Sequence, residues 1–221
     1  MADPSEQMPL PLSMPSPATP ADTPATENPS SISREDLNLL PMRSYQGPVD
    51  LLDCDEAVEQ AIPKIAAEAL LGFDTETKPV FKPGVSHPPA LVQLAGESRA
   101  WIFQLHKLRR LDGLLAVLED RRIIKAGIAL ADDLKKLREV HVFEPAGFTE
   151  VGDLARKLGM TQTGLRTLAG LVLGFRVSKR EQRSNWARAE LSLSQITYAA
   201  TDAWVSRELY LALKQRIADK T

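Results

Sequence analysis

The chain alternates between short apolar runs and longer segments in which apolar residues recur at helical spacing. The runs LLGFDTET (70–77), ALVQLAG (90–96) and RAWIFQL (99–105) are typical of strands, and the GES between the last two indicates a hairpin. A fourth run, RIIKAGIA (122–129), lies between two helical segments and is also predicted to be a strand. Three early strands joined by tight turns, followed by a strand between helices, predict an α/β fold with a mixed sheet.

Helical spacing predicts six helices, and one polar segment near the end of the chain is predicted to be a loop. The helical segments are 53–71, 108–120, 131–140, 149–159, 164–174 and 192–220. Pro63 is a possible interruption of the first helix, and Gly174 is expected to end the fifth. The segment RVSKREQRSNWARAE (176–190) has no apolar periodicity and therefore reads as a loop.

The first 44 residues differ in composition from the rest. Nine of the sixteen prolines lie in residues 1–41, together with many Ser, Thr and Ala residues and no apolar periodicity. Such a segment buries too little apolar surface to offset the entropy lost on ordering. We therefore predict a disordered Pro/Ser/Thr-rich tail over 1–44, which could recruit a protein partner, and a folded domain over 45–221.

Composition argues against several classes of protein. The 221 residues carry a net charge of −2, so no strong overall field indicates a nucleic-acid partner; without residues 1–46 the charge is about +2. Cys54 is the single cysteine, which rules out an intrachain disulfide and favours an intracellular, reducing compartment, nucleus or cytoplasm. The three histidines lie far apart, so a His/Cys zinc site is not expected. No apolar run is long enough to span a membrane.

The first candidate site is the acidic end of the strand 70–77. Asp74 and Glu76 stand at positions i and i+2, so their side chains project from the same face of the strand. Two carboxylates placed in this way repel each other unless a cation lies between them, and oxygen ligands suit Mg²⁺ or Mn²⁺. The alternative is a solvated strand end, which this short motif alone does not exclude.

Two acids open the segment LADDLKKL (130–137). Leu130, Leu134 and Leu137 form an apolar stripe on the predicted helix. At about 100° per residue, Asp133 borders this stripe, whereas Asp132 points to water. Asp133 is thus the candidate for a functional role, and simple helix-start chemistry, favoured by the helix dipole, is the alternative for both acids.

The terminal helix contains a further acidic position in YAATDA (198–203). Tyr198, Asp202, Val205 and Leu209 recur at helical spacing and share one face, which places Asp202 towards the interior. Buried Asp is rare unless it is paired or binds a metal, and Tyr198 brings its hydroxyl close to this carboxylate. A plain Tyr–Asp hydrogen bond is the alternative. Together, the four carboxylates could hold two divalent ions, an arrangement that promotes in-line phosphoryl displacement.

The sequence resembles the DEDD superfamily of exonucleases, in its tyrosine-containing DEDDy branch, which includes ribonuclease D. The three exonuclease motifs of that branch are matched, in the same order along the chain, by FDTET (73–77), GIALADDLKKL (127–137) and YAATDA (198–203). KREQRSNW (179–186) and ALVQLA (90–95) resemble further stretches of these proteins, and the similarity covers roughly residues 45–215. The resemblance implies a ribonuclease H-like fold with a mixed five-stranded sheet flanked by helices. It also implies 3′→5′ removal of nucleotides from DNA or RNA with two Mg²⁺ or Mn²⁺ ions.

The resemblance implies a role for each site residue. Asp74, Glu76 and Asp202 would hold the first ion, and Asp74 would bridge to the second. Asp133 would support the second ion through water. Tyr198 would orient the attacking water or help to deprotonate it. The competing hypothesis is a member of this fold that binds nucleic acid or serves as a scaffold with little or no catalysis; the presence of all five residues favours an enzyme.

The loop predicted at 176–190 is rich in basic residues. It carries five Arg or Lys residues between positions 176 and 188 against one acid. Because the loop leads into the helix with the YAATDA motif, we expect it to contact phosphates, with Lys179 and Arg183 as candidate nucleic-acid-binding residues. An ordinary solvated charge run is the alternative. Trp186 in this loop could stack on a base, but packing in the core fits a tryptophan better.

Overall fold

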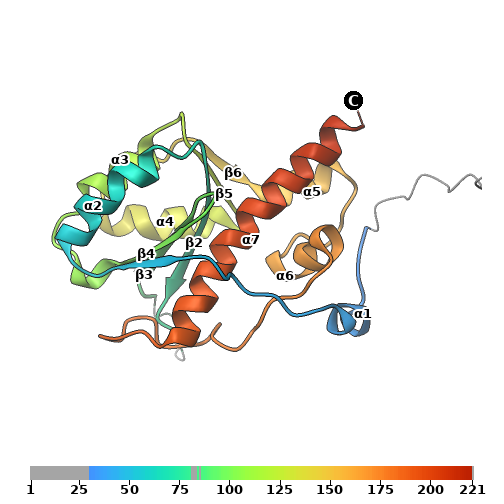
Figure 1. The fold of residues 1–221 in the computed structure, drawn as a ribbon, viewed down its shortest axis with the longest axis horizontal. Coiled ribbons are helices and arrows are strands. Elements are labelled where there is room, and N and C mark those ends of the chain that lie inside the picture. Colours follow the sequence, from blue (N-terminus) through green and yellow to red (C-terminus); the bar gives the residue numbers. More distant parts are fainter. Residues whose placement is uncertain (1–29, 81–83, 85, 221) are drawn as a thin grey trace, which may run out of the picture.

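The computed structural model describes residues 30–80, 84 and 86–220, which fold into a six-stranded sheet with helices on both faces (Figure 1). The strands are β1 (Val49–Leu52), β2 (Leu70–Thr77), β3 (Pro89–Ala95), β4 (Ala100–Gln104), β5 (Ile124–Gly127) and β6 (Phe148–Glu150). The helices are α1 (Arg34–Leu39), α2 (Asp55–Ala66), α3 (Asp112–Glu119), α4 (Leu130–Val140), α5 (Val151–Lys157), α6 (Leu165–Leu168) and α7 (Leu193–Ala218), with a 3-10 turn η1 (Leu105–Lys107) and a π-helical segment η2 (Ala169–Leu173). None of the helices in these described residues is both long enough and apolar enough to cross a membrane.

The sheet is mixed, with strand order β1-β4-β3-β2-β5-β6. β3 pairs antiparallel with β2 and with β4, and the other three pairs are parallel. The turn between β3 and β4 is closed by the Gly96 amide, which donates to the Arg99 carbonyl at 2.9 Å. β2 therefore lies inside the sheet: its first residues, Leu70–Gly72, pair with β5, and its acidic end pairs with β3.

Side chains of β2 alternate between two layers of helices. Leu71 and Phe73 pack into a core with residues of α2, α3 and α4 on one face of the sheet. The residues between them face α7, which crosses the other face as the long red helix of Figure 1. The period of two along β2 thus sends Leu71 and Phe73 to one layer and the carboxylates to the other.

Gly72 determines how closely α7 approaches β2. A Cβ atom at this position would lie 1.9 Å from the carbonyl oxygen of Ala203, so no residue other than glycine fits without moving the helix. Ala203 directly follows Asp202, and Gly72 stands two positions before Asp74. This backbone contact therefore brings the acidic ends of β2 and α7 together.

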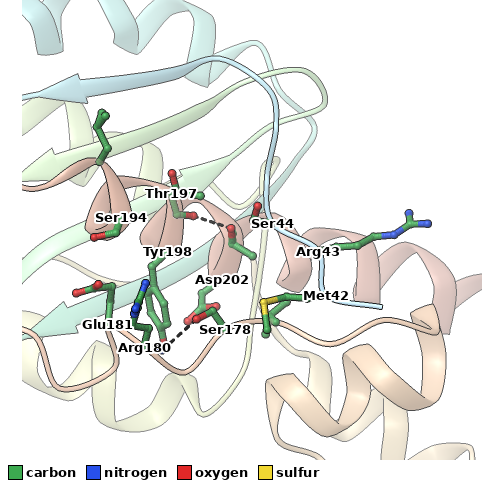
Figure 2. A pocket seen from close by; sticks show the side chains of 13 residues that line it. Met42, Arg43, Ser44, Ser178, Arg180, Glu181, Ser194, Thr197, Tyr198 and Asp202 are labelled. Carbon is green, nitrogen blue, oxygen red and sulfur yellow. Dashed lines mark hydrogen bonds between the residues drawn. The ribbon is translucent and has the colours of Figure 1, made fainter. Parts of the chain in front are cut away.

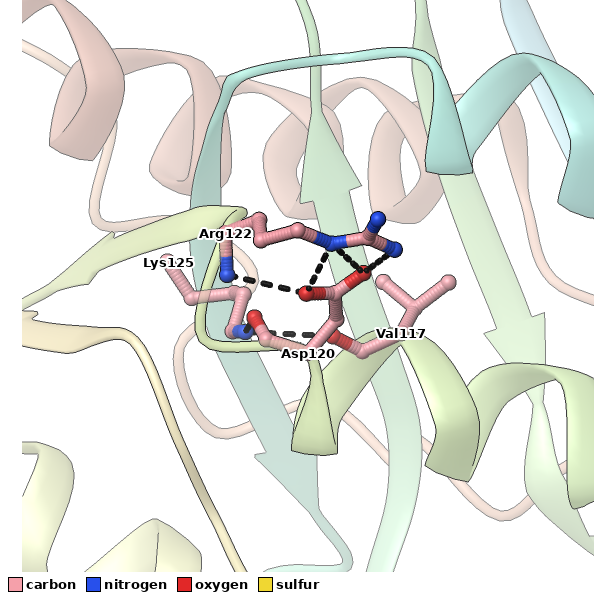
Figure 3. Close-up of polar contacts among 4 residues, drawn as sticks. All are labelled: Val117, Asp120, Arg122 and Lys125. Carbon is pink, nitrogen blue, oxygen red and sulfur yellow. Dashed lines mark hydrogen bonds and ion pairs between the residues drawn. The ribbon is translucent and has the colours of Figure 1, made fainter.

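A buried ammonium group joins β5 to α3. The side chain of Lys125 is fully buried, and its Nζ donates to the carbonyl oxygens of Val117 (3.1 Å) and Asp120 (2.7 Å) at the end of α3 (Figure 3). Nζ also lies 5.2 Å from the ring centroid of Phe148 in β6. Burial lowers the pKa of Lys125 to about 8, and the charge of Asp120 opposes this shift. These contacts fix β5, which leads directly into α4.

The strands and helices predicted from apolar periodicity are confirmed, most of them with shorter bounds. Pro63 lies inside α2 and does not end it. Gly174 ends the fifth predicted helix, as expected, with φ of 71°. That helix consists of one α-helical turn, α6, followed by η2. Residues 177–190 contain no helix or strand, which confirms the loop.

The number of strands and the extent of the tail differ from prediction. The sheet has six strands among the described residues rather than five, and β1 and β6 were not predicted. β6 includes Thr149 and Glu150, which were assigned to the following helix. The predicted disorder is wrong for residues 30–44, which include α1 and hydrogen-bond to the domain; residues 1–29 lie outside the described residues.

Candidate active site

Three carboxylates converge where β2 meets α7. Oxygen atoms from Asp74, Glu76 and Asp202 all lie within 4.8 Å of one another. The first two project from the same face of β2, as their spacing predicted, and Asp202 is buried on α7. The close backbone contact at Gly72 provides the approach that joins them. The structure thus brings together three of the four predicted acids in one group.

Burial and mutual repulsion dominate the electrostatics of this group, and the positive charge of Arg166 offsets them in part. Burial, and then the neighbouring carboxylates, raises the pKa of Asp74 well above its ordinary value. The same two causes raise the pKa of Glu76 to about 9. Burial raises the pKa of Asp202 to about 7, against the lowering effect of a hydrogen bond from Tyr198 and the charge of Arg166. Oxygen-only donors that repel one another in a partly buried site match the preference of Mg²⁺ or Mn²⁺.

Asp133 lies outside this group but is held beside it. The hydroxyl of Thr75 donates to Asp133 Oδ1 at 2.6 Å, which ties the first turn of α4 to β2. Asp133 is half-buried and Asp132 is exposed, in agreement with the helical-wheel prediction. Burial raises the pKa of Asp133, and the bond from Thr75 opposes that shift. The functional role of Asp133 stays a prediction.

The chain enters α4 through a constrained turn. Ala129 has φ of 60°, the left-handed region that non-glycine residues seldom adopt. The amide of Leu130 then donates to Glu150 Oε2 at 3.0 Å, so a carboxylate from the end of β6 satisfies the start of the helix. This turn fixes the direction in which the two acids of α4 point.

Tyr198 is buried and has a partner that sequence reasoning missed. Arg166 Nη2 donates to the Tyr198 hydroxyl oxygen at 3.2 Å and to the Ser178 carbonyl at 3.1 Å. Nη1 of the same arginine donates to Gln182 Oε1 at 3.2 Å, so Arg166 links α6, α7 and the basic loop. The single sequence signal was an arginine within the otherwise apolar segment 164–174, and nothing in its spacing indicated Tyr198.

Two cavities flank Tyr198 and Asp202. The larger, of about 520 Å³, is shown in Figure 2; it is lined by Met42, Arg43, Ser44, Val177, Ser178, Arg180, Glu181, Leu193, Ser194, Thr197, Tyr198, Thr201 and Asp202. The smaller, of about 350 Å³, is lined by Leu37, Gly164, Leu165, Arg166, Thr167, Lys179, Gln182, Tyr198 and Asp202. Both have volumes in the range of small-ligand sites, about 300–1,000 Å³. Tyr198 and Asp202 therefore belong to the walls of both cavities.

The basic loop is placed partly as expected. Lys179 lines the smaller cavity and Arg180 the larger, and Arg183 is exposed on the same loop. Trp186 is fully buried, with its ring centroid 5.8 Å from that of Tyr198, which confirms its position in the core. Trp186 therefore packs beside Tyr198 inside the core and is not exposed to stack on a base.

The fold and the acidic group define a class of protein, the nucleases with a ribonuclease H-like fold. Structural similarity supports the fold: the Nibbler EXO domain of Aedes aegypti superposes with a TM-score of 0.73, 20% identity and coverage of 81% of this chain and 94% of that one. Ribonuclease D of Escherichia coli superposes with a TM-score of 0.67, 22% identity and coverage of 76% and 45%.

The family itself is established by sequence. Residues 49–218 match the model of the 3′-5′ exonuclease family, and the chain belongs to this family. It is 30% identical over 200 residues to the bifunctional 3′-5′ exonuclease/ATP-dependent helicase WRN of Mus musculus, which covers 86% of this chain. It is 29% identical over 168 residues to ribonuclease D of Pseudomonas paraeruginosa, covering 75% of this chain. The matched regions span only 14% and 44% of these two relatives. The predicted resemblance to DEDDy exonucleases is confirmed.

Proposed function

We propose that this chain is a metal-dependent 3′–5′ exonuclease that hydrolyses phosphodiester bonds from the 3′ end of DNA or RNA and releases nucleoside 5′-monophosphates. The observation that carries the proposal is the group formed by Asp74, Glu76 and Asp202, with carboxylate oxygens within 4.8 Å of one another. Membership of the 3′-5′ exonuclease family supports the same reaction.

The proposed metal ligands follow from the geometry of the acids. Asp74, Glu76 and Asp202 would hold one Mg²⁺ or Mn²⁺, and Asp133, fixed by Thr75, would support a second ion shared with Asp74. When bound, such ions lower the pKa of a water nucleophile and neutralise charge on the phosphate that is attacked. The mutual repulsion of the carboxylates supports this assignment, because a divalent cation relieves it.

Tyr198 orients the attacking water in this proposal and does not act as the base. Burial, followed by the charges of Asp202 and Glu76, raises the pKa of Tyr198 above its ordinary value, so the phenol stays protonated near neutral pH. Its oxygen already accepts a hydrogen bond from Arg166. A hydroxyl has one proton to donate, and Tyr198 donates it to Asp202, so the remaining lone pair of its oxygen is the group that would accept a hydrogen bond from the water.

Substrate binding is assigned to the basic loop. Lys179 and Arg180 line the cavities next to the acidic group, and Arg183 is exposed to solvent on the same loop. Contacts of this kind bind the phosphate backbone without reading bases, so they suit an enzyme that acts along a strand. From composition, we further propose that the Pro-rich N-terminal tail recruits a protein partner and that the protein works inside the cell.

Incubation of the purified chain with defined nucleic acids tests the proposal. The substrates are 5′-labelled single-stranded DNA, single-stranded RNA and a duplex with a recessed 3′ end, each with Mg²⁺, Mn²⁺ or excess chelator. Circular single-stranded DNA is the control, because it has no 3′ end. We expect stepwise shortening of at least one linear substrate, mononucleotide products, no cleavage of the circle and no activity in chelator.

An Asp74→Ala variant separates the enzyme from the scaffold hypothesis. It should bind oligonucleotide and fail to hydrolyse it. Wild-type chain that binds nucleic acid with either ion but does not shorten any substrate would favour the scaffold. Full activity in excess chelator would refute the metal mechanism.

A further inference from the structure

The segment of residues 30–46, which we call the N-terminal strap, precedes the region that matches the family and is nevertheless fastened to the domain. The family match begins at residue 49. At one end of the strap, the Ser30 carbonyl accepts from the Thr161 amide at 2.9 Å. At the other end, the Tyr45 amide donates to Thr201 Oγ1 at 3.0 Å. The strap thus lies ahead of the matched family region and has defined attachment points at both ends.

The middle of the strap pairs with the first residue of the basic loop. The Arg176 amide donates to the Pro41 carbonyl at 3.0 Å, and the Arg43 amide donates to the Arg176 carbonyl at 2.9 Å. Arg176 Nε donates to the Leu40 carbonyl at 2.9 Å. Because Thr201 directly precedes the buried aspartate of α7, the strap connects the basic loop with the helix that carries the acidic site.

Both cavities beside the active site have a wall from this strap. Met42, Arg43 and Ser44 line the larger cavity together with Tyr198 and Asp202 (Figure 2). Leu37 lines the smaller cavity. In Figure 2 the Arg43 side chain points away from the tyrosine, and its guanidinium lies 5.6 Å from the ring centroid of Phe175. Arg43 therefore packs on the domain, and Met42 is the exposed apolar side chain that the strap presents at the larger cavity.

The lining of the larger cavity combines apolar and cationic groups. Met42 is 55% exposed and Leu193 is 83% exposed, so two large apolar side chains stand open to solvent at one cavity. Arg180 from the basic loop lines the same cavity, together with two acids, Glu181 and Asp202, and several hydroxyl groups. A nucleotide presents an apolar base face and an anionic phosphate, and it matches both parts of this lining.

We propose that the N-terminal strap forms a second wall of the substrate groove, in which Met42 and Leu193 contact the base of a nucleotide near the 3′ end and Arg180 contacts an adjacent phosphate. The inference rests on the proposed exonuclease function and assigns part of its substrate binding to residues that precede the matched family region. The strap contributes to substrate binding, and the acidic group carries out the hydrolysis.

Matched variants of two exposed strap residues test this role. Met42→Ala removes the side chain at the cavity. Leu39→Ala is the control, because Leu39 is 83% exposed in the same segment and lines neither cavity. We expect Met42→Ala to raise KM for a single-stranded oligonucleotide about tenfold, which corresponds to about 1.4 kcal/mol, with kcat nearly unchanged. Met42→Leu should restore KM, and Leu39→Ala should match wild type.

The outcomes separate this inference from the proposed function. Thermal unfolding of all three variants shows whether a change in KM reflects a loosened fold. If Met42→Ala is as stable as wild type and its KM is unchanged, the strap only packs on the domain and the inference is wrong. If the wild-type chain shows no hydrolysis, the proposed function fails. The affinities of Met42→Ala and wild type for the same oligonucleotide are then compared by fluorescence anisotropy. Equal affinities overturn the inference.

Discussion

Replacement of Asp74 by Asn should stabilise the metal-free protein while abolishing its activity. The carboxylate oxygens of Asp74, Glu76 and Asp202 lie within 4.8 Å of one another. Two unit charges at that separation repel by about 3 kcal/mol at an effective dielectric constant of about 20. Whether the acids remain ionised and repel one another or take up protons, the folded state loses free energy relative to the unfolded chain.

The expected gain is smaller than the full repulsion. Asn removes the charge of Asp74 and keeps its size, but its buried amide has poorer hydrogen-bond partners than it finds in water. We therefore expect a net stabilisation of about 1–3 kcal/mol in chelator at about pH 8, which is several degrees in Tm for a domain of this length. With bound Mg²⁺, the wild-type protein should be more stable than Asp74→Asn, because the ion binds the folded wild-type site and stabilises it by mass action.

The pH dependence gives the sign of the effect independently. The pKa values of about 9 for Glu76 and about 7 for Asp202 lie above the ordinary values of the two groups in an unfolded chain. The folded protein then binds more protons than the unfolded chain over this window. The contribution of these two groups to metal-free stability is fully present below about pH 4 and is lost as pH rises towards about 9. Asp74→Asn should show a smaller decrease.

The measurement is thermal unfolding of wild type and Asp74→Asn in excess chelator across this pH range, repeated with Mg²⁺. Asp132→Asn is the control, since Asp132 is exposed on α4 and should change little. A metal-free Asp74→Asn protein that is less stable than wild type at about pH 8 would refute the reasoning, because Asp74 would then be a structural group.

The remaining predictions concern chemistry and substrate grip. Asp133→Asn should reduce the single-turnover cleavage rate severely, whereas Asp132→Asn should stay within a few-fold of wild type; the reverse result would move the second-ion role to Asp132. Replacing both Lys179 and Arg183 with Glu should raise KM and reduce the log–log salt slope by about one unit per lost phosphate contact, and an unchanged slope would leave the loop a solvated surface. Arg166→Gln should lower kcat more than it raises KM, with partial rescue by Arg166→Lys; equal kcat in all three proteins would remove its positioning role.

Apolar periodicity predicted the elements that pack most of the core. The runs that became β2, β3, β4 and β5 are rich in apolar residues because they lie inside the sheet. β1 and β6 are edge strands of four and three residues, too short to show a period. Residues 30–44 looked disordered because their order depends on remote partners, such as the pairing of Met42 with Arg176. The local amino-acid composition does not indicate such long-range contacts.

In the candidate site too, the sequence predicted the features that depend on local geometry and missed those that depend on remote contacts. The period of two aligned Asp74 with Glu76, and the helical period placed Asp202 on the buried face of α7. Both predictions concern the direction in which a side chain points from its strand or helix, and this direction follows from local backbone geometry. The bond from Arg166 to Tyr198 spans 32 positions and joins two different helices, so no local period could reveal it.

The distance between β2 and α7 is the step that sequence periodicity did not supply. Both periods would persist if α7 lay a few ångströms farther from the sheet, but the acids would then be separate solvated groups. The approach depends on the missing side chain at Gly72, where a Cβ would lie 1.9 Å from the Ala203 carbonyl oxygen. A glycine inside an apolar strand usually costs stability, and here it permits the backbone contact that places Asp202 within reach of Asp74 and Glu76. The acidic site thus depends on this glycine as much as on the acids themselves.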